Sequence, residues 1–164
     1  MEICFVPDRD YGKFLRDARL AEVHQGEVVD TAGKKLGEHE GIEFYTIGQR
    51  RGLGISSSQP LYVVELDAVN NRVIVGDDTQ LNRDAFQIAN CNWIAPERMS
   101  EATGAFECTA RIRYNHPGAA AVVTPGFSGT ASVKLHEPAR AVTPGQACVL
   151  YDGDRVLGGG WITR

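Results

Sequence analysis

The sequence predicts a mainly β protein: a small central domain with one helix and β-hairpins at residues 1–82, followed by an antiparallel β-barrel at residues 83–164. Three observations lead to this fold class. Apolar residues alternate with polar ones over most of the chain, Gly, Pro, Asn and Asp separate these runs at short intervals, and only one stretch has helical spacing. The chain of 164 residues is 43% apolar, which is enough to form a core.

The helix is expected over residues 10–20, where Tyr11, Phe14, Leu15 and Ala18 recur at helical spacing after a possible N-cap, Asp10. Two β-hairpins should follow. The first joins residues 26–30 to 35–39, and the second joins residues 61–66 to 72–76 through a turn rich in asparagine. Residues 45–58, between the hairpins, have the glycine and serine content of an ordered but irregular loop.

A domain boundary is expected at residues 77–83, because this stretch is polar and follows a completed hairpin. The rest of the chain reads as six short strands separated by Pro-Gly, Gly-Thr and Asp-Gly turns, the pattern of a small barrel or sandwich. The candidate strands are residues 86–93, 104–114, 119–124, 130–135, 146–151 and 155–162.

Charge and hydropathy limit the class of protein. With 17 basic and 21 acidic residues the net charge is −4, which argues against a protein that coats nucleic acid nonspecifically. Local basic sites remain at Arg50-Arg51 and at Arg111-x-Arg113. Since the sequence has neither an apolar run long enough for a membrane span nor a signal peptide, we expect a cytoplasmic protein that does not bind membranes.

The four cysteines show no C-x-x-C pair, so neither a zinc site nor a disulfide scaffold is indicated. Cys91, Cys108 and Cys148 lie among apolar or β-forming residues, where cysteine usually acts as a small buried hydrophobe. Only Cys4 suggests chemistry. The four histidines have no ligand-like spacing either, so we expect no metal site.

The segment Gly48-Gln49-Arg50-Arg51-Gly52-Leu53-Gly54 superficially resembles a phosphate-binding loop. It lacks the strand, loop and helix frame and the lysine pattern of such loops, so we reject both a nucleotide loop and a Rossmann-like methyl-donor site. Further along, Arg111-Ile112-Arg113-Tyr114 alternates, which predicts two arginines on one strand face and Ile112 and Tyr114 on the other.

Several motifs in order along the chain resemble the bacterial tRNA-specific 2-thiouridylases. They are Ile3-Cys4-Phe5-Val6-Pro7-Asp8, Gly37 to Gly41, Tyr45 to Ile55, Leu61 to Val64, Pro138 to Gln146 and Leu157 to Ile162. The resemblance implies an enzyme that uses ATP and Mg²⁺ to activate the wobble uridine of tRNA and replaces an oxygen with sulfur from a cysteine persulfide. It also implies an ATP-binding domain and another cysteine before these residues, so we expect the chain to be a C-terminal portion, inactive by itself, with no cofactor bound.

Under this resemblance Cys4 bears the persulfide, because a sulfur carrier must be an accessible thiolate. A second thiol, which the family places upstream, would release the product by forming a disulfide. The residues matching the family's tRNA contacts are Arg113, Tyr114 and Gln146. The partners implied are tRNA and a persulfide sulfur-donor protein, and we expect the chain itself to be monomeric.

Alternatives stay open at this stage. Arg50 and Arg51 either belong to a loop with a purely structural role or form a further tRNA contact, and the two arginines near residue 112 could equally lie on a solvated strand face. For the whole chain, the main alternative is a noncatalytic RNA-binding β module. A weaker one is a thiol hydrolase, which would need a histidine beside Cys4.

Overall fold

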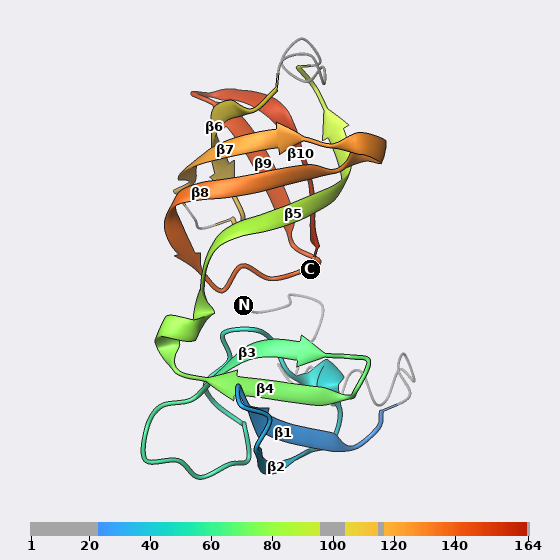
Figure 1. The fold of residues 1–164 in the computed structure, drawn as a ribbon, viewed down its shortest axis with the longest axis vertical. Coiled ribbons are helices and arrows are strands. Elements are labelled where there is room, and N and C mark those ends of the chain that lie inside the picture. The colour runs from blue at the N-terminus through green and yellow to red at the C-terminus, as the bar shows by residue number, and fades with distance from the viewer. Residues whose placement is uncertain (1–22, 96–103, 115–116, 164) are drawn as a thin grey trace, which may run out of the picture. The chain divides into compact units, whose positions relative to one another are not determined.

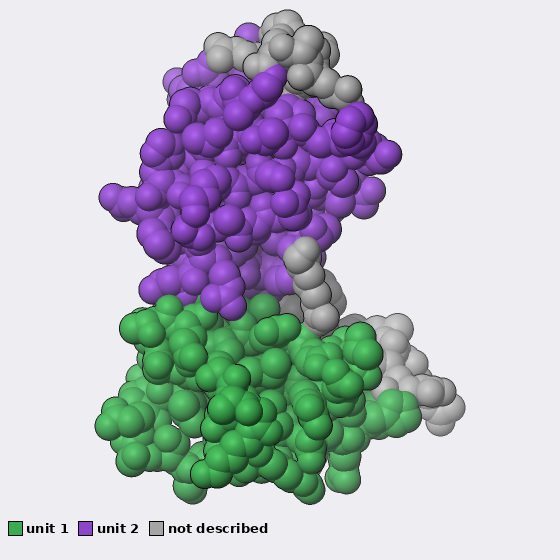
Figure 2. All heavy atoms as spheres, viewed as in Figure 1, with its two compact units in different colours: residues 1–81 green, residues 82–164 purple. Residues whose placement is uncertain are grey.

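The computed structural model describes residues 23–95, 104–114 and 117–163 (Figure 1). The helix expected over residues 10–20 lies outside these ranges. The chain forms two compact units, residues 1–81 and residues 82–164, drawn in different colours in Figure 2 and described here one at a time. Within the described ranges no helix is both long enough and apolar enough to span a membrane.

The first unit is built on a four-stranded sheet. Its strands are β1 (Gly26–Asp30), β2 (Lys35–His39), β3 (Tyr62–Asp67) and β4 (Arg72–Gly76), in the order β2-β1-β4-β3 (Figure 1). Both predicted hairpins are present as antiparallel pairs, β1 with β2 and β3 with β4. The two hairpins join through parallel pairing of β1 with β4, a contact that alternation within each hairpin does not reveal.

Turn chemistry closes each hairpin. The Asp30 carboxylate accepts hydrogen bonds from the backbone N–H groups of Ala32 and Lys34, both at 2.9 Å, and Asp67 accepts similar bonds in the β3–β4 turn. Asn71 ends that turn with a φ of 51°, a conformation that asparagine tolerates better than most residues. The expectation that asparagine supplies a positive φ in this turn is confirmed.

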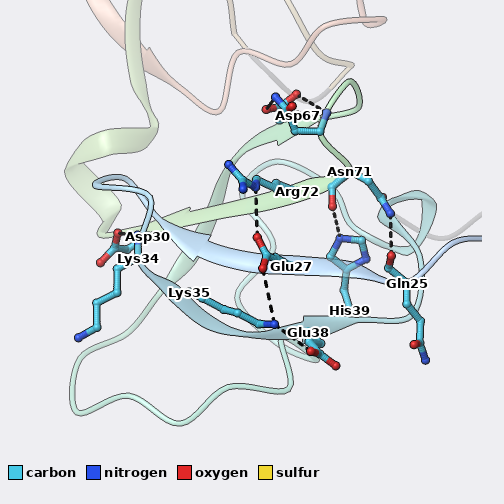
Figure 3. A network of polar contacts seen from close by, with 11 residues as sticks. Gln25, Glu27, Asp30, Lys34, Lys35, Glu38, His39, Asp67, Asn71 and Arg72 are labelled. Atoms are coloured by element: carbon cyan, nitrogen blue, oxygen red, sulfur yellow. Dashed lines mark hydrogen bonds and ion pairs between the residues drawn. The ribbon is translucent and has the colours of Figure 1, made fainter.

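A polar network crosses the surface of this sheet (Figure 3). Glu27 lies between Lys35, at 3.6 Å, and Arg72, at 3.3 Å. These side chains are exposed, so solvent screening leaves each pair only a small effect on stability. Nearby, His39 is buried and its Nε2 lies 3.2 Å from the backbone oxygen of Asn71, so it links β2 to the β3–β4 turn.

The interior of the first unit is small and aliphatic. Four valines of the sheet and Leu53, from the loop between the hairpins, form its buried cluster: Val28, Val63, Val73, Val75 and Leu53. Two short 3-10 helices accompany the sheet, η1 (Ile42–Phe44) and η2 (Asp78–Leu81). Since Leu53 is 6% exposed, the irregular loop is anchored to the core.

The second unit is a closed six-stranded barrel, which confirms the predicted fold class. Its strands are β5 (Asn82–Trp93), β6 (Phe106–Arg111), β7 (Ala119–Pro125), β8 (Ala131–Arg140), β9 (Ala147–Asp152) and β10 (Arg155–Thr163). They follow the order β10-β5-β8-β7-β6-β9, and all neighbours are antiparallel. A short 3-10 helix, η5 (Phe127–Gly129), joins β7 to β8, and the alternate residues of the strands fill the interior.

Two strands are longer than the pattern predicted. The β5 strand begins at Asn82 instead of Phe86, and β8 continues to Arg140 instead of ending at Leu135. Their pairing shifts register between Arg83 and Ala85, so several β8 residues lie opposite Asp84. Such a bulge accommodates a residue without an N–H donor, which explains how β8 runs through Pro138.

The barrel closes where β10 passes between β5 and β9, and the run Gly158-Gly159-Gly160 makes this possible. A Cβ atom on Gly159 would overlap the carbonyl oxygen of Cys148 and lie 3.1 Å from the Cα of Val149. A Cβ atom on Gly160 would lie 2.7 Å from the carbonyl oxygen of Ala89. The neighbouring backbones therefore come too close for any residue but glycine at these positions.

We predict that Gly159→Ala lowers the free energy of unfolding of the barrel by about 2 kcal/mol, because the added methyl group must displace backbone. Both tryptophans, Trp93 and Trp161, lie in the barrel, so their fluorescence during urea unfolding reports on this unit. The matched control is Gly153→Asn, at a β9–β10 turn position with a φ of 56° and open space around it. Equal stability of the two variants would contradict the prediction.

Candidate functional site

Antiparallel closure gathers several predicted site residues at one end of the barrel. The strands β6, β8 and β10 run in the same direction, so they all end where β5, β7 and β9 begin (Figure 1). Arg113 and Tyr114 follow β6, and Gln146 directly precedes β9. The sequence separates Arg113 from Gln146 by more than thirty residues, and the strand order returns both to the same end.

Arg113 is exposed and held by the backbone of another strand. Its Nη2 donates a hydrogen bond to the carbonyl oxygen of Arg140, the last residue of β8. The side chain is thereby oriented across the end of the barrel. The guanidinium keeps further N–H donors for a second partner, since it carries five in all.

The prediction for the residues around Arg113 is wrong in one respect. The strand β6 ends at Arg111, three residues before the expected end, so alternation does not extend to Tyr114. Ile112 is 1% exposed, whereas Tyr114 is 100% exposed and does not share the buried side with it. A fully exposed tyrosine ring is available for stacking, although it has no packing role in the described structure.

Gln146 is anchored through its backbone. Its N–H donates to the carbonyl oxygen of Thr143 at 3.3 Å, and its carbonyl oxygen accepts from the N–H of Ile162 at 2.8 Å. Its side chain is half-buried, and the buried Oε1 has no hydrogen-bond donor among the residues that the structure describes. An unpaired amide oxygen of this kind is costly unless a partner supplies the donor.

Arg50 and Arg51 lie in the first unit, on the loop between the two hairpins, and both are exposed. Gln49 stiffens this loop: its Nε2 donates to the Arg51 carbonyl oxygen at 2.9 Å, and its Oε1 accepts from the Thr46 N–H at 3.1 Å. Arg50 lines a cleft of about 320 Å³ together with Ser56, Ser57 and Gln59. The loop thus presents an arginine beside hydroxyl and amide groups.

The same loop does not fit the triphosphate of ATP. After Gly54 the chain passes through residues 55–61 into strand β3, with no helix whose N-terminus could face a phosphate. Nor do His, Cys, Asp and Glu side chains form a group of three or more that could hold a metal ion within the described ranges.

The three barrel cysteines are free thiols with raised pKa values. Burial raises the pKa of Cys108 to about 11, with the Glu107 and Asp152 carboxylates adding to the shift, and that of Cys148 to about 12. Burial also raises the pKa of Cys91. Because the thiolate is the nucleophile, all three are poorly reactive at neutral pH.

Cys4 lies outside the described residues. Of the histidines, His39 is buried in the first unit, and the Nε2 of His136 lies 2.9 Å from a carboxylate oxygen of Glu107 on the barrel surface. Sequence reasoning missed the packing of Arg111, the last residue of β6, against Tyr151. That pair is forty residues apart, and only the β6–β9 register could have indicated it.

Comparison with known proteins matches each of the two parts of the chain to a family model. Residues 83–162 match the aminomethyltransferase beta-barrel domain, and residues 12–77 match the tRNA methyl transferase PRC-barrel domain. The two models together match most of the chain. Their descriptions name methyl transfer, for which the sequence shows no methyl-donor motif.

Curated relatives carry a different name. The chain is 46% identical to the tRNA-specific 2-thiouridylase MnmA of Acidobacterium capsulatum, 48% to that of Geobacter metallireducens and 49% to that of Chlorobium chlorochromatii. Each alignment includes 98% of this chain but only 45%, 43% and 45% of the respective relative. The chain thus spans less than half the length of these relatives.

We predict that Cys108 and Cys148 resist alkylation by iodoacetamide at pH 8 in the folded protein. With a pKa of about 11, only about one Cys108 thiol in a thousand is ionised at that pH. Peptide mapping by mass spectrometry measures the modification of each cysteine. Urea should expose both sites and serves as the control, and alkylation in the folded protein at the rate of a free cysteine would contradict the assignment.

Proposed function

We propose that this chain, which belongs to the tRNA-specific 2-thiouridylase family, supplies the tRNA-binding surface and the persulfide-bearing cysteine of an enzyme that makes 2-thiouridine at the wobble position. The observation that carries the proposal is the identity of 46–49% to such enzymes over 98% of the chain. Support from the structure is the convergence of Arg113, Tyr114 and Gln146 on one end of a closed barrel.

In the proposed reaction ATP transfers AMP to the oxygen on C2 of the uridine and releases pyrophosphate. The terminal sulfur of a persulfide on Cys4 then bonds to C2, and AMP leaves with the oxygen. A second thiol attacks the Cys4 sulfur and breaks the S–S bond, so the outer sulfur stays on C2 and the two cysteines form a disulfide. A dithiol reductant restores both thiols for the next turnover.

The chemistry of the barrel thiols supports a second thiol elsewhere. A resolving cysteine must attack as a thiolate, and the pKa values of about 11 and 12 keep Cys108 and Cys148 protonated at neutral pH. Cys91 is likewise shifted upward. We therefore assign the resolving thiol, the ATP site and its Mg²⁺ to parts of the enzyme outside the described residues.

The proposed tRNA contacts have distinct roles. Arg113 is suited to bind a backbone phosphate through its remaining N–H groups, and the exposed ring of Tyr114 is suited to stack on an unpaired base. Gln146 offers an amide that can hydrogen-bond a base edge or a ribose hydroxyl. Arg50 and Arg51 would form a second contact from the first unit, on a loop that Gln49 stiffens.

We predict that the chain binds a tRNA transcript in a salt-dependent manner and that Arg113→Ala weakens binding roughly fivefold to tenfold at low salt, since one phosphate contact is lost. Fluorescence anisotropy at two or more salt concentrations measures the affinity. Arg72→Ala is the matched control, because it removes one exposed arginine that already pairs with Glu27. If the wild-type chain does not bind tRNA at low salt, the proposed RNA-binding role is wrong.

We predict that Cys4 is the cysteine that accepts sulfane sulfur. Incubation of the chain with inorganic polysulfide, followed by mass spectrometry, should find a persulfide on Cys4 at neutral pH and little on Cys108 or Cys148, whose raised pKa values disfavour the thiolate. Cys4→Ser should abolish the signal, whereas Cys91→Ser, the control, should retain it. A persulfide found mainly on a barrel cysteine would contradict the assignment and favour a noncatalytic RNA-binding module.

A further inference from the structure

Arg111 is a preorganised cation beside the proposed tRNA contacts. It is the last residue of β6, and its neighbours Ala110 and Ile112 are 0% and 1% exposed, so its side chain points outward from the barrel. Arg113 lies two residues further along the chain, beyond the end of β6. Its guanidinium reaches the last residue of β8, whereas that of Arg111 lies over Tyr151 of β9, so the two groups extend toward different strands.

The ring of Tyr151 lies against the guanidinium of Arg111. The central carbon of the guanidinium lies 5.0 Å from the centroid of the Tyr151 ring. Tyr151 pairs with Thr109 across β6 and β9, so Arg111 is its diagonal neighbour on the same face. A cation–π contact of this kind restrains the guanidinium, whose planar set of N–H groups suits a bidentate acceptor.

Gly118 lies beside the stem of Arg111 on the other side of β6. It precedes β7 next to the Ala110–Ala119 pair and has a φ of 103°, a conformation that favours glycine. A Cβ atom there would clash with the methyl group of Thr109 but would lie at ordinary contact distance from Arg111, 3.4 Å from its Cγ and 3.7 Å from its Nε. The backbone conformation and Thr109 therefore require the glycine, and the arginine stem packs beside it.

Arg111 and Arg113 differ from other basic residues of the barrel in their ion pairing. Within the described ranges neither Arg111 nor Arg113 forms an ion pair with a carboxylate. Lys134, by contrast, pairs with Asp84 on the neighbouring strand, and His136 approaches Glu107. A chain with a net charge of −4 therefore presents two guanidinium groups on the barrel that no described carboxylate neutralises.

We infer that Arg111, held by Tyr151, binds a phosphodiester of the tRNA backbone other than the one proposed for Arg113. The inference rests on the proposed function and adds a residue to it. The Tyr151 ring restrains the guanidinium, whose N–H groups can donate two parallel N–H···O bonds to one phosphate. Tyr151 is a positioning residue, because it acts through Arg111.

The test compares the affinity of Arg111→Ala and Lys134→Ala chains for a tRNA transcript over a range of salt concentrations. Each variant removes one exposed positive charge from the barrel surface, and Lys134 is already neutralised by Asp84. Arg111→Ala should weaken binding roughly fivefold to tenfold and reduce the slope of log K against log salt by about 0.7 to 0.9. Lys134→Ala should change the affinity less than about twofold.

Two more variants separate orientation from charge. Tyr151→Leu should weaken binding about twofold to fivefold while the salt slope stays unchanged, because the charge remains and only the stacking is lost. Arg111→Lys should also keep the slope but bind more weakly than wild type, since lysine lacks the planar fork. Tryptophan fluorescence during urea unfolding checks that each variant has a folded barrel.

The outcomes separate the two proposals. If wild type binds tRNA and Arg111→Ala behaves like Lys134→Ala, the inference is wrong and the proposed function stands. If Tyr151→Leu weakens binding and Arg111→Ala does not, the ring contacts RNA directly and the inference is again overturned. If the wild-type chain does not bind tRNA at low salt, both proposals fail together.

Discussion

Closure of the barrel by β10 is the constraint on which the second unit depends. The strand passes between β5 and β9 with almost no space between the backbones, and the glycines at 158–160 remove the side chains that would keep the three strands apart. Closure pairs every strand on both sides and leaves no exposed edge. It also requires register shifts in β10, which lie between Val156 and Gly158 and between Gly159 and Trp161.

The same closure determines where side chains meet. An antiparallel barrel returns alternate strand ends to one side. The backbone positions of Arg111 at the end of β6, Arg113 just after it, Arg140 at the end of β8 and Gln146 before β9 therefore share one end. Rigid strands hold the backbone of these positions, and the Arg140 carbonyl oxygen and the Tyr151 ring orient two of the side chains. Inside the barrel, burial raises the pKa values of Cys108 and Cys148 and so suppresses the formation of their thiolates.

Sequence patterns predicted where the strands lie better than which strands pair with one another. Alternation and turn residues located both hairpins and all six barrel strands, because each depends on residues close in the sequence. The parallel pairing of β1 with β4 and the bulge that carries β8 through Pro138 depend on distant partners, and no local pattern contains them. In the candidate site, Gln146 was identified by resemblance alone, whereas Arg113 also stood out as part of a local basic cluster. The Arg111–Tyr151 contact required the β6–β9 register, and the end of β6 at Arg111 left Tyr114 exposed against expectation.

The central claim is that one end of the barrel binds tRNA, and amide chemical shifts measured during a titration test it most directly. Uniformly ¹⁵N-labelled chain is titrated with a tRNA transcript at low salt. We expect the largest changes at Arg111, Arg113, Tyr114 and Gln146, with small changes at the opposite end, around η5 between β7 and β8. Changes concentrated at η5, or spread evenly over the barrel, would contradict the account.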